Sequence, residues 1–376
     1  SDLGYDFTRT YNSRSTDVSV LGKGWTFVGN ETLSVLENED VLYTDEDGTV
    51  HTFKKDGTQY TSPKGLYEQL LRVNDTTFTL TDKSQFSQTF KIGQKSNNFY
   101  LASYKDQYEN QIDFIRNAED QLITVSEKNG IEKQKEINIS YTDNKISKVQ
   151  FADHWTMYKY NSDLLDHTIT GSDQTPSTIT ENFTYENGQL TKYEDGKNNQ
   201  TVFSYSKNEL TIFDQQAKAV PEDISVTNTY QFNEKENEFK SIDTEGSETL
   251  YRRDLKNNSY AVSEIENSDA TTTTQDYDDQ YNITDSVDEE GVTTQYKYDK
   301  YGNLEEQTST DGTITNKYND FNQLINSVDV TGEVTNNQYQ GPYLKSSTVG
   351  VETTSYDYDV YGRSTKTSYA NGTYEE

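Results

Sequence analysis

The residues best suited to catalysis or metal binding are three histidines, His51, His154 and His167. Zinc sites and general bases need partner side chains at fixed spacing, and the sequence contains no H-x-H or H-x-x-x-H pattern. Cysteine is absent, which excludes thiol nucleophiles and disulfides. A G-x-S-x-G elbow and a phosphate-binding G-x-x-x-x-G-K-S/T loop are missing as well. We therefore predict no catalytic, cofactor-binding or metal-binding residue, and no enzyme activity.

Acidic residues and tryptophans are the remaining candidates for a binding site. Asp and Glu together number 64, so a glycosidase-like carboxylate pair would arise by chance and nothing selects one. Asp45-Glu46-Asp47-Gly48 resembles the start of a calcium loop, but the EF-hand spacing and its final glutamate are missing. We interpret this string as a hairpin turn and His51 as a strand residue beside it. Trp25 and Trp155 have aromatic or apolar neighbours, which favours buried packing over sugar stacking.

The composition is unusual for a folded protein. The chain has 376 residues, a net charge of -31 and 30% hydrophobic residues, values that border on those of disordered chains. Aromatic residues nevertheless make up 12%, with 30 tyrosines and only 4 prolines, and this favours a folded chain. Because tyrosine buries its ring while its hydroxyl stays hydrated, we predict a thin sheet with one wet face and no thick apolar core.

The acidity and the absence of long apolar runs limit the partners. Binding to nucleic acid or to anionic membranes depends on Lys and Arg, so both are excluded as partners of this chain. No apolar run approaches the ~18 residues of a membrane span, which excludes membrane insertion. The lack of cysteine fits the cytosol and the exterior of a Gram-positive bacterium equally well. No signal peptide opens the chain, and we expect it to be a piece of a longer polypeptide.

Repeats of about twenty residues dominate the C-terminal third. Five units begin at tyrosines spaced 19 to 21 residues apart: Tyr277, Tyr298, Tyr318, Tyr339 and Tyr358. They share the pattern Tyr-Asp/Asn-x-aromatic-Gly/Asn-x-Leu, followed by about eight variable residues and a Gly-x-x-Thr string. Eroded units precede them and begin at Tyr141, Tyr160, Tyr185 and Tyr205. The repetition predicts one structural unit that is built many times in succession.

Each fixed position of the unit has a local physical reason. Asp299 and Asn319 favour turns because their side chains bond their own backbone. A positive φ is expected three residues further on, at Gly302 and Asn322, and also at Gly362. These turns, together with Gly-containing dipeptides such as Asp311-Gly312 and Asn371-Gly372, predict β-hairpins.

Two further features of the unit predict strands. Leu304 and Leu324 begin runs that alternate apolar and polar residues, and the returning strand ends with tyrosines two apart, such as Tyr296 and Tyr298. Residues two apart share a face of a strand, so we expect the tyrosines to stack as a ladder across neighbouring strands. We predict an all-β fold, a long antiparallel sheet of hairpins.

Three regions follow along the chain. Residues 1–100 form an N-terminal β region, residues 101–276 carry degenerate hairpin repeats, and residues 277–376 carry the regular repeats and continue the same sheet. The irregular stretch 217–276, with Pro221, is either a widened loop or a degenerate repeat, and nothing in it resembles a linker. Residues 65–71 are compatible with a short helix or with a strand.

The repeat resembles the YD repeat of Rhs proteins, bacterial wall-associated (WapA-type) proteins, insecticidal toxin-complex C components and teneurins. The N-terminal string R-T-Y-N-S-R-S…G-K-G-W…D-G-T-V-H-T-F resembles the segment that precedes the repeats in Rhs and wall-associated proteins. Arg9 and Arg14 within it are expected to pair with carboxylates and to fix the first strands. No D-P-x-G string is present, so no self-cleavage residue can be inferred from the resemblance.

The resemblance implies that the sheet spirals into part of a hollow shell. It also implies a function: a non-catalytic shell segment of a secreted polymorphic toxin that encloses or displays a C-terminal toxic domain of the same polypeptide, in competition between bacteria. The cell wall and the target-cell surface are further expected partners, and the expected location is secreted or wall-bound in a Gram-positive bacterium. We also expect the acidity to line the lumen and to hold a basic cargo. The alternative function is an adhesion or carbohydrate-binding surface, marked by exposed aromatic residues in a groove.

Overall fold

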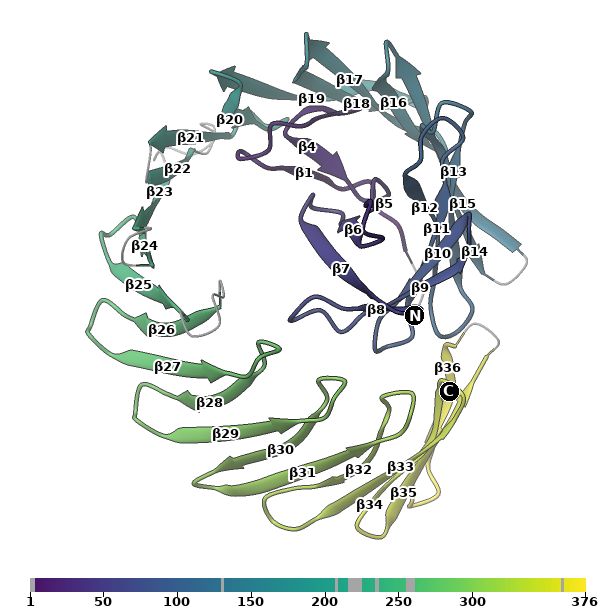
Figure 1. The fold of residues 1–376 in the computed structure, drawn as a ribbon, viewed down its shortest axis with the longest axis vertical. Coiled ribbons are helices and arrows are strands. Elements are labelled where there is room, and N and C mark those ends of the chain that lie inside the picture. Colours follow the sequence, from purple (N-terminus) through teal and green to yellow (C-terminus); the bar gives the residue numbers. More distant parts are fainter. Residues whose placement is uncertain are drawn as a thin grey trace.

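The computed structural model describes residues 4–129, 132–206, 209–215, 225–233, 237–254, 261–359 and 362–376. In these ranges the chain forms strands and turns and no helix. The predicted all-β fold is confirmed: one long antiparallel sheet spirals around a hollow, and the first strands lie inside it (Figure 1).

We call residues 4–30, with the short strands β1 to β4, the N-terminal segment, and we call residues 31–110, with the strands β5 to β12, the lobe. The N-terminal segment holds β1 (Arg9–Tyr11), β2 (Val18–Ser19), β3 (Gly22–Lys23) and β4 (Trp25–Phe27). The lobe holds β5 (Thr32–Val35), β6 (Val41–Thr44), β7 (Val50–Asp56), β8 (Gln59–Thr61), β9 (Gln69–Asn74), β10 (Thr77–Thr81), β11 (Ser87–Ile92) and β12 (Phe99–Lys105).

The remaining strands form the wall of the spiral. Its first part holds β13 (Gln111–Arg116), β14 (Leu122–Asn129), β15 (Glu132–Thr142), β16 (Lys145–Phe151), β17 (His154–Asn161), β18 (Leu164–Ser172), β19 (Thr175–Glu186), β20 (Gln189–Glu194), β21 (Gln200–Ser206), β22 (Glu209–Gln215), β23 (Ser225–Asn233), β24 (Glu238–Ile242), β25 (Glu248–Arg253) and β26 (Val262–Glu266). The regular repeats form β27 (Thr272–Tyr277), β28 (Ile283–Val287), β29 (Thr293–Tyr298), β30 (Leu304–Ser309), β31 (Gly312–Tyr318), β32 (Leu324–Val328), β33 (Val334–Gln340), β34 (Tyr343–Val349), β35 (Glu352–Tyr358), β36 (Ser364–Ser368) and β37 (Tyr374–Glu375).

Antiparallel pairing runs from each strand to the next along the wall. The strand β5 also pairs with β12, through Leu33–Phe99 and Thr32–Tyr100, so the lobe folds back on itself while the sheet as a whole stays open. β12 spans residues 100 and 101 and β27 spans residues 276 and 277, so the sheet runs through both expected region boundaries. In the irregular stretch the chain forms β23 to β27, and Pro221 lies outside the described residues. The stretch 65–71, for which helix and strand both stay open, lies in a turn and at the start of β9.

The apolar core is confined to the first half of the chain. Among the described residues, every buried apolar side chain lies between Tyr5 and Leu190. The largest side chains that are fully buried are Phe27, Phe53, Phe78 and Phe90. From β24 to β36 the strand residues are half-buried or exposed, as in a single-layer sheet. The prediction of a thin sheet is therefore wrong for the first half, because the N-terminal segment and the lobe cover one face of the wall there.

Candidate functional site

The inner face of the wall is the face that packs against the N-terminal segment. Trp25 contacts Phe183 of β19 edge to face, with ring centroids 5.2 Å apart, and the Arg14 guanidinium lies 5.7 Å from the ring centroid of Phe232 in β23. Side chains alternate along a strand, so every second residue from these positions shares the inner face. Directly paired residues of neighbouring strands also share a face. The strand pairing therefore identifies the inner-face residues of each successive strand around the spiral.

Arg9 connects the N-terminal segment to the wall. Its Nη2 atom lies 2.9 Å from Oε2 of Glu181 in β19. Its guanidinium lies within 6.0 Å of three ring centroids, those of Trp25, Tyr158 and Phe183. Burial pushes the pKa of Glu181 up, but hydrogen bonds from Tyr193 and Arg9 outweigh it, so the pKa lies below its ordinary value. The expected pairing of Arg9 with a carboxylate is confirmed, whereas Arg14 lies over Phe232.

Main-chain contacts fix the same segment along one rim of the wall. Three hydrogen bonds join it to the wall, each a few residues after a tyrosine that begins an eroded repeat. Lys23 N donates to Asp163 O at 2.7 Å, and Ile146 N donates to Val20 O at 2.9 Å. Leu190 N donates to the Tyr11 hydroxyl at 2.9 Å. Trp25 adds a side-chain bond from Nε1 to Oη of Tyr185, at 2.9 Å. Trp25 is 8% exposed, which confirms packing over sugar stacking for this residue.

Glu31 is a fully buried carboxylate at the junction of the N-terminal segment and the lobe. The Gly29 N–H donates to its Oε2 at 2.7 Å, and the Tyr104 hydroxyl donates to its Oε1. Burial raises the pKa of Glu31 to about 7, against the opposing effect of these hydrogen bonds. Arg116 is half-buried beside it; its Nη2 donates to the Gly29 carbonyl at 2.7 Å, and desolvation lowers the pKa of its guanidinium.

Sequence reasoning did not find Glu31, Arg116 or Glu181. None of them lies in a motif or at a spacing typical of a site, and Glu181 meets Arg9 across 172 residues of chain. No local signal distinguishes these residues in a chain with 64 acidic residues.

The turn of the regular repeat is built around its aspartate or asparagine. Oδ1 of Asp299 accepts the N–H groups of Tyr301 and Asn303, at 2.8 and 2.9 Å, and the Gly302 N–H donates to the Asp299 carbonyl. The backbone at Gly302 has a φ of 73°, and Asn322 and Gly362 have φ values of 59° and 80°. These are the positive φ angles that the sequence predicts.

The repeat tyrosines lie opposite the repeat leucines on paired strands. Tyr298 pairs with Leu304 and Tyr318 pairs with Leu324, each beside a β-bulge, and Tyr339 pairs with Leu344. Several hydroxyls donate to a main-chain carbonyl of the preceding strand: Tyr277 to Val262 at 2.5 Å, Tyr318 to Leu304 at 3.0 Å and Tyr358 to Leu344 at 3.0 Å. The predicted stacked ladder is therefore mostly replaced by hydrogen bonds to the backbone. Tyr358 does contact a second ring, that of Tyr343, at 5.1 Å.

Next to the repeat tyrosines, most side chains of the inner face are uncharged; Lys345, whose Nζ lies 5.7 Å from the ring centroid of Tyr358, is an exception. Strand pairing places these side chains there: Gln275, Ser286, Gln307, Ile314, Asn316, Ser327, Asn337, Ser347 and Thr354. Charged side chains of the same strands take the opposite register, as in the Lys297–Glu306 pair, whose Nζ and Oε1 atoms lie 2.7 Å apart. The expectation that acidic residues line the lumen is therefore wrong for the regular repeats, because the period of two directs the charges outward.

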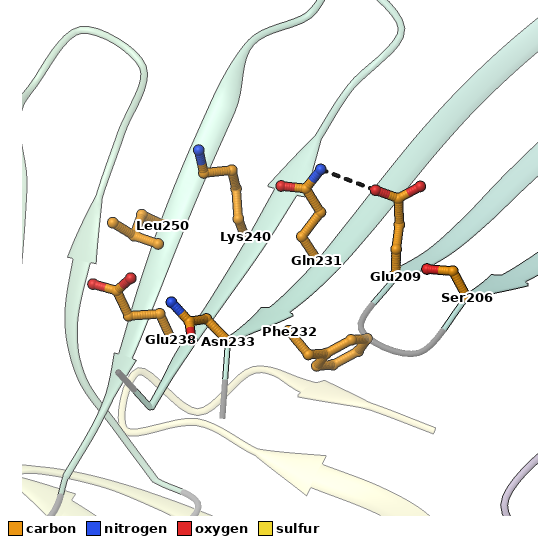
Figure 2. A pocket seen from close by; sticks show the side chains of 8 residues that line it. All are labelled: Ser206, Glu209, Gln231, Phe232, Asn233, Glu238, Lys240 and Leu250. Atoms are coloured by element: carbon orange, nitrogen blue, oxygen red, sulfur yellow. Dashed lines mark hydrogen bonds between the residues drawn. The ribbon is translucent and has the colours of Figure 1, made fainter. Parts of the chain in front are cut away.

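The outer face carries an ion network around Arg252 of β25. Its Nε lies 3.1 Å from Glu238 and its Nη2 lies 3.0 Å from Glu266, and Nη1 contacts Glu264. A shallow pocket of about 450 Å³ lies beside this network (Figure 2). Its residues are Ser206, Glu209, Gln231, Phe232, Asn233, Glu238, Lys240 and Leu250. Glu209 accepts a hydrogen bond from Gln231 at 3.0 Å, and Lys240 pairs with Glu248 at 2.7 Å.

The histidines lie apart from one another. His51 is in β7 and its Nε2 lies 2.9 Å from Oδ2 of Asp45, which anchors the turn before it. This placement confirms the strand and turn assignments. His154 and His167 each contact the aspartate that precedes them in sequence. Within the part of the chain that the structure describes, no group of three or more His, Cys, Asp or Glu side chains is arranged to hold a metal ion. That part also contains no helix long and apolar enough to cross a membrane.

The comparisons with known proteins agree with this geometry. Residues 1–53 match a family described as a domain of unknown function, DUF6531. The chain is 34% identical over 113 residues to the tRNA3(Ser)-specific nuclease WapA of Bacillus spizizenii and to the tRNA nuclease WapA of Bacillus subtilis. Each match covers 27% of this chain and 5% of the relative, so the chain corresponds to a small part of those proteins.

A chain of the Photorhabdus luminescens Tc holotoxin pore has a similar fold. It superposes with a TM-score of 0.55 at 10% sequence identity and covers 89% of this chain, which in turn spans 19% of that chain. The N-terminal match, the repeat unit and the spiral sheet agree with one another. Taken together, these findings support a chain that is similar to Rhs/YD-repeat proteins of the WapA type.

Proposed function

We propose that this chain is a non-catalytic wall segment of a secreted toxin shell, which encloses or displays a toxic domain located C-terminally in the same polypeptide. The observation that carries the proposal is one continuous antiparallel sheet, single-layered from β24 to β36, that curves around a hollow (Figure 1). Its role would be competition between bacteria, with the polypeptide secreted and held at a Gram-positive cell wall or brought to a target-cell surface.

The chemistry of the inner face supports this function. Tyrosine rings with Asn, Gln, Ser and Thr side chains can contact a polypeptide through apolar area and hydrogen bonds at once. Such a face does not select cargo by charge, so toxic domains of either sign are compatible with the same wall. The relatives are named as tRNA nucleases, and a nuclease is the class of cargo that we propose.

Protease protection of the full polypeptide tests this proposal. A toxic domain that follows the shell should resist digestion while the shell is intact, and it should be cleaved as quickly as the free domain once the shell is unfolded in mild urea. A polypeptide without such a domain, or a domain cleaved at the free rate in the intact protein, contradicts the proposal.

One feature favours adhesion or carbohydrate binding as a second candidate function. On the inner face, Phe232, Phe239 and Tyr251 line a cavity of about 820 Å³ together with Arg14, and aromatic rings in a hollow are typical of sugar-binding surfaces. Binding of the isolated chain on a glycan array, lost in Phe239→Ala, would support this function. A chain that binds no glycan on the array excludes it.

A further inference from the structure

Two rows of turns, far apart in sequence, meet where the spiral completes a turn. The turns of the regular repeats between β27 and β32 point toward the lobe strands β8 and β9 (Figure 1). We call the contact between the two rows the seam. The lobe contributes the turns at 62–68, 82–86 and 106–110, and the repeats contribute those at 278–282, 299–303 and 319–323 and the turn that holds Gly362.

Tyr67 of the lobe occupies the turn at Gly302. A Cβ atom added to Gly302 would lie 2.5 Å from Cζ of Tyr67 and 2.6 Å from its Cε2, closer than real Cβ contacts come. The Tyr67 hydroxyl also accepts a hydrogen bond from Nδ2 of Asn282, in the preceding repeat turn. The ring of Tyr67 thus occupies the space that a Cβ atom of residue 302 would need.

The same arrangement recurs on both sides of this contact. A Cβ atom at Gly362 would lie 2.7 Å from Cδ1 of Tyr108, a lobe residue whose ring also contacts Tyr343 at 5.3 Å. At the other end the roles are exchanged, because a Cβ atom at Gly65 of the lobe would lie 3.1 Å from the ring of Tyr281 in a repeat turn. Each of these three contacts therefore places an aromatic ring against a glycine.

Polar contacts fill the interval between the rings. Nζ of Lys83 lies 3.2 Å from the Gly302 carbonyl oxygen, and Nδ2 of Asn322 donates to the Lys83 carbonyl at 3.1 Å. Beyond them, a cavity of about 450 Å³ separates the rows, between Gln107 of the lobe and Phe321 of the repeats. The seam is held by a few contacts and not by continuous packing.

Backbone conformation does not explain glycine at these positions. Tyr281 and Asn322 occupy the same turn position as Gly302, with φ values of 65° and 59°. The turn therefore tolerates a side chain wherever no ring from the lobe lies against it. We infer that Gly302 and Gly362 leave the space that the rings of Tyr67 and Tyr108 occupy, and that these ring-to-glycine contacts close the wall of the shell against the lobe. The inference concerns the closure of the wall and holds whether or not a toxic domain lies inside.

Distance measurements across the seam test this inference on the whole chain. Because the protein contains no cysteine, Ser84→Cys and Asp320→Cys, exposed in facing turns, provide unique positions for two spin labels. The closed seam should give a short, narrow distance distribution. Gly302→Ala with Gly362→Ala should abolish that peak, since the added methyl groups displace both rings.

Two control glycines distinguish the loss of space for the rings from the strain of a side chain at positive φ. Gly332 and Gly372 also have positive φ, 86° and 84°, but a Cβ atom at either would meet nothing within 4 Å. The Gly332→Ala and Gly372→Ala variant bears the same conformational cost and should keep the short distance. Loss of the peak in this control, or its survival in Gly302→Ala with Gly362→Ala, overturns the inference.

A second pair of variants keeps the test decisive if the alanine variant fails to fold. Tyr67→Ala with Tyr108→Ala removes the rings without straining any turn and should open the seam. Tyr67→Phe with Tyr108→Phe keeps the rings and should leave it closed, which would show that ring occupancy and not the bond to Asn282 is decisive. A closed seam in the double alanine variant contradicts the inference.

Discussion

At the scale of single residues, the buried carboxylate Glu31 couples the N-terminal segment to the lobe. It accepts hydrogen bonds from Gly29 and Tyr104, and burial raises its pKa from 4.5 to about 7. An acid with a raised pKa in the folded state binds its proton more tightly there than in the unfolded chain. The stability that this proton provides is complete below pH 4.5 and is lost as the pH rises through 7.

The variant Glu31→Gln should remove this pH dependence. Between pH 5 and pH 8 the wild type should lose on the order of 3 kcal/mol of unfolding free energy through Glu31, since one pKa unit corresponds to about 1.4 kcal/mol. The difference between variant and wild type, measured by urea denaturation followed through tryptophan fluorescence, should therefore grow with pH. The exposed residue Glu37 provides the control, Glu37→Gln. If the two variants have the same pH profile, burial of Glu31 is not the cause.

At the scale of the element, the tyrosine of several repeats joins one hairpin to the strand before it. The Tyr318 hydroxyl donates to the carbonyl of Leu304, a residue that lies beside the bulge in the pairing of β29 with β30. The unit thus supplies, from its own side chain, a donor where the bulge disturbs the main-chain pairing. A hairpin that carries this bond is tied to its neighbour and depends less on an apolar core.

Removing one such hydroxyl should cost about 1 kcal/mol, the usual net value of a hydrogen bond in a protein. Tyr318→Phe keeps the ring and deletes only the donor, so its midpoint of urea denaturation, followed by circular dichroism, should decrease. Tyr374→Phe is the matched control, because Tyr374 is 58% exposed at the edge of the sheet. Equal midpoints for the two variants would show that the bond to the Leu304 carbonyl contributes nothing.

The repeat unit could be predicted from the sequence, whereas its contacts with distant parts of the chain could not, because the unit depends on neighbouring residues alone. The turns at Asp299 and Asn319 follow from local rules, because a side chain bonding its own backbone needs only neighbouring residues. The outward direction of the charges also follows from the period of two, although the sequence interpretation placed them in the lumen. The contacts of Arg9 with Glu181 and of Tyr67 with Gly302 join residues far apart in the chain. They depend on how many strands complete one turn of the spiral, which no local pattern determines.

At the scale of the whole molecule, apolar burial is distributed unevenly along one continuous sheet. Among the described residues it ends at Leu190, while strand pairing continues to β37. In such an array each strand is stabilised mainly by its neighbours, and the free energy of local opening follows the apolar area that is buried nearby. The strands β27 to β36 should therefore open more easily than β13 to β18, although strand pairing is continuous through both parts.

Hydrogen exchange measured by mass spectrometry should show this difference directly. Peptides from β31 to β33 should exchange faster at neutral pH than peptides from β15 to β17, whose residues Ile137, Ile139 and Ile146 are buried in the core. Arg9→Leu should accelerate exchange in β19, where Glu181 would lose its partner, and leave β31 to β33 unchanged. Equal protection across the two parts of the wall would mean that main-chain pairing alone sets its stability. In that case the N-terminal segment would position the first strands without stabilising them.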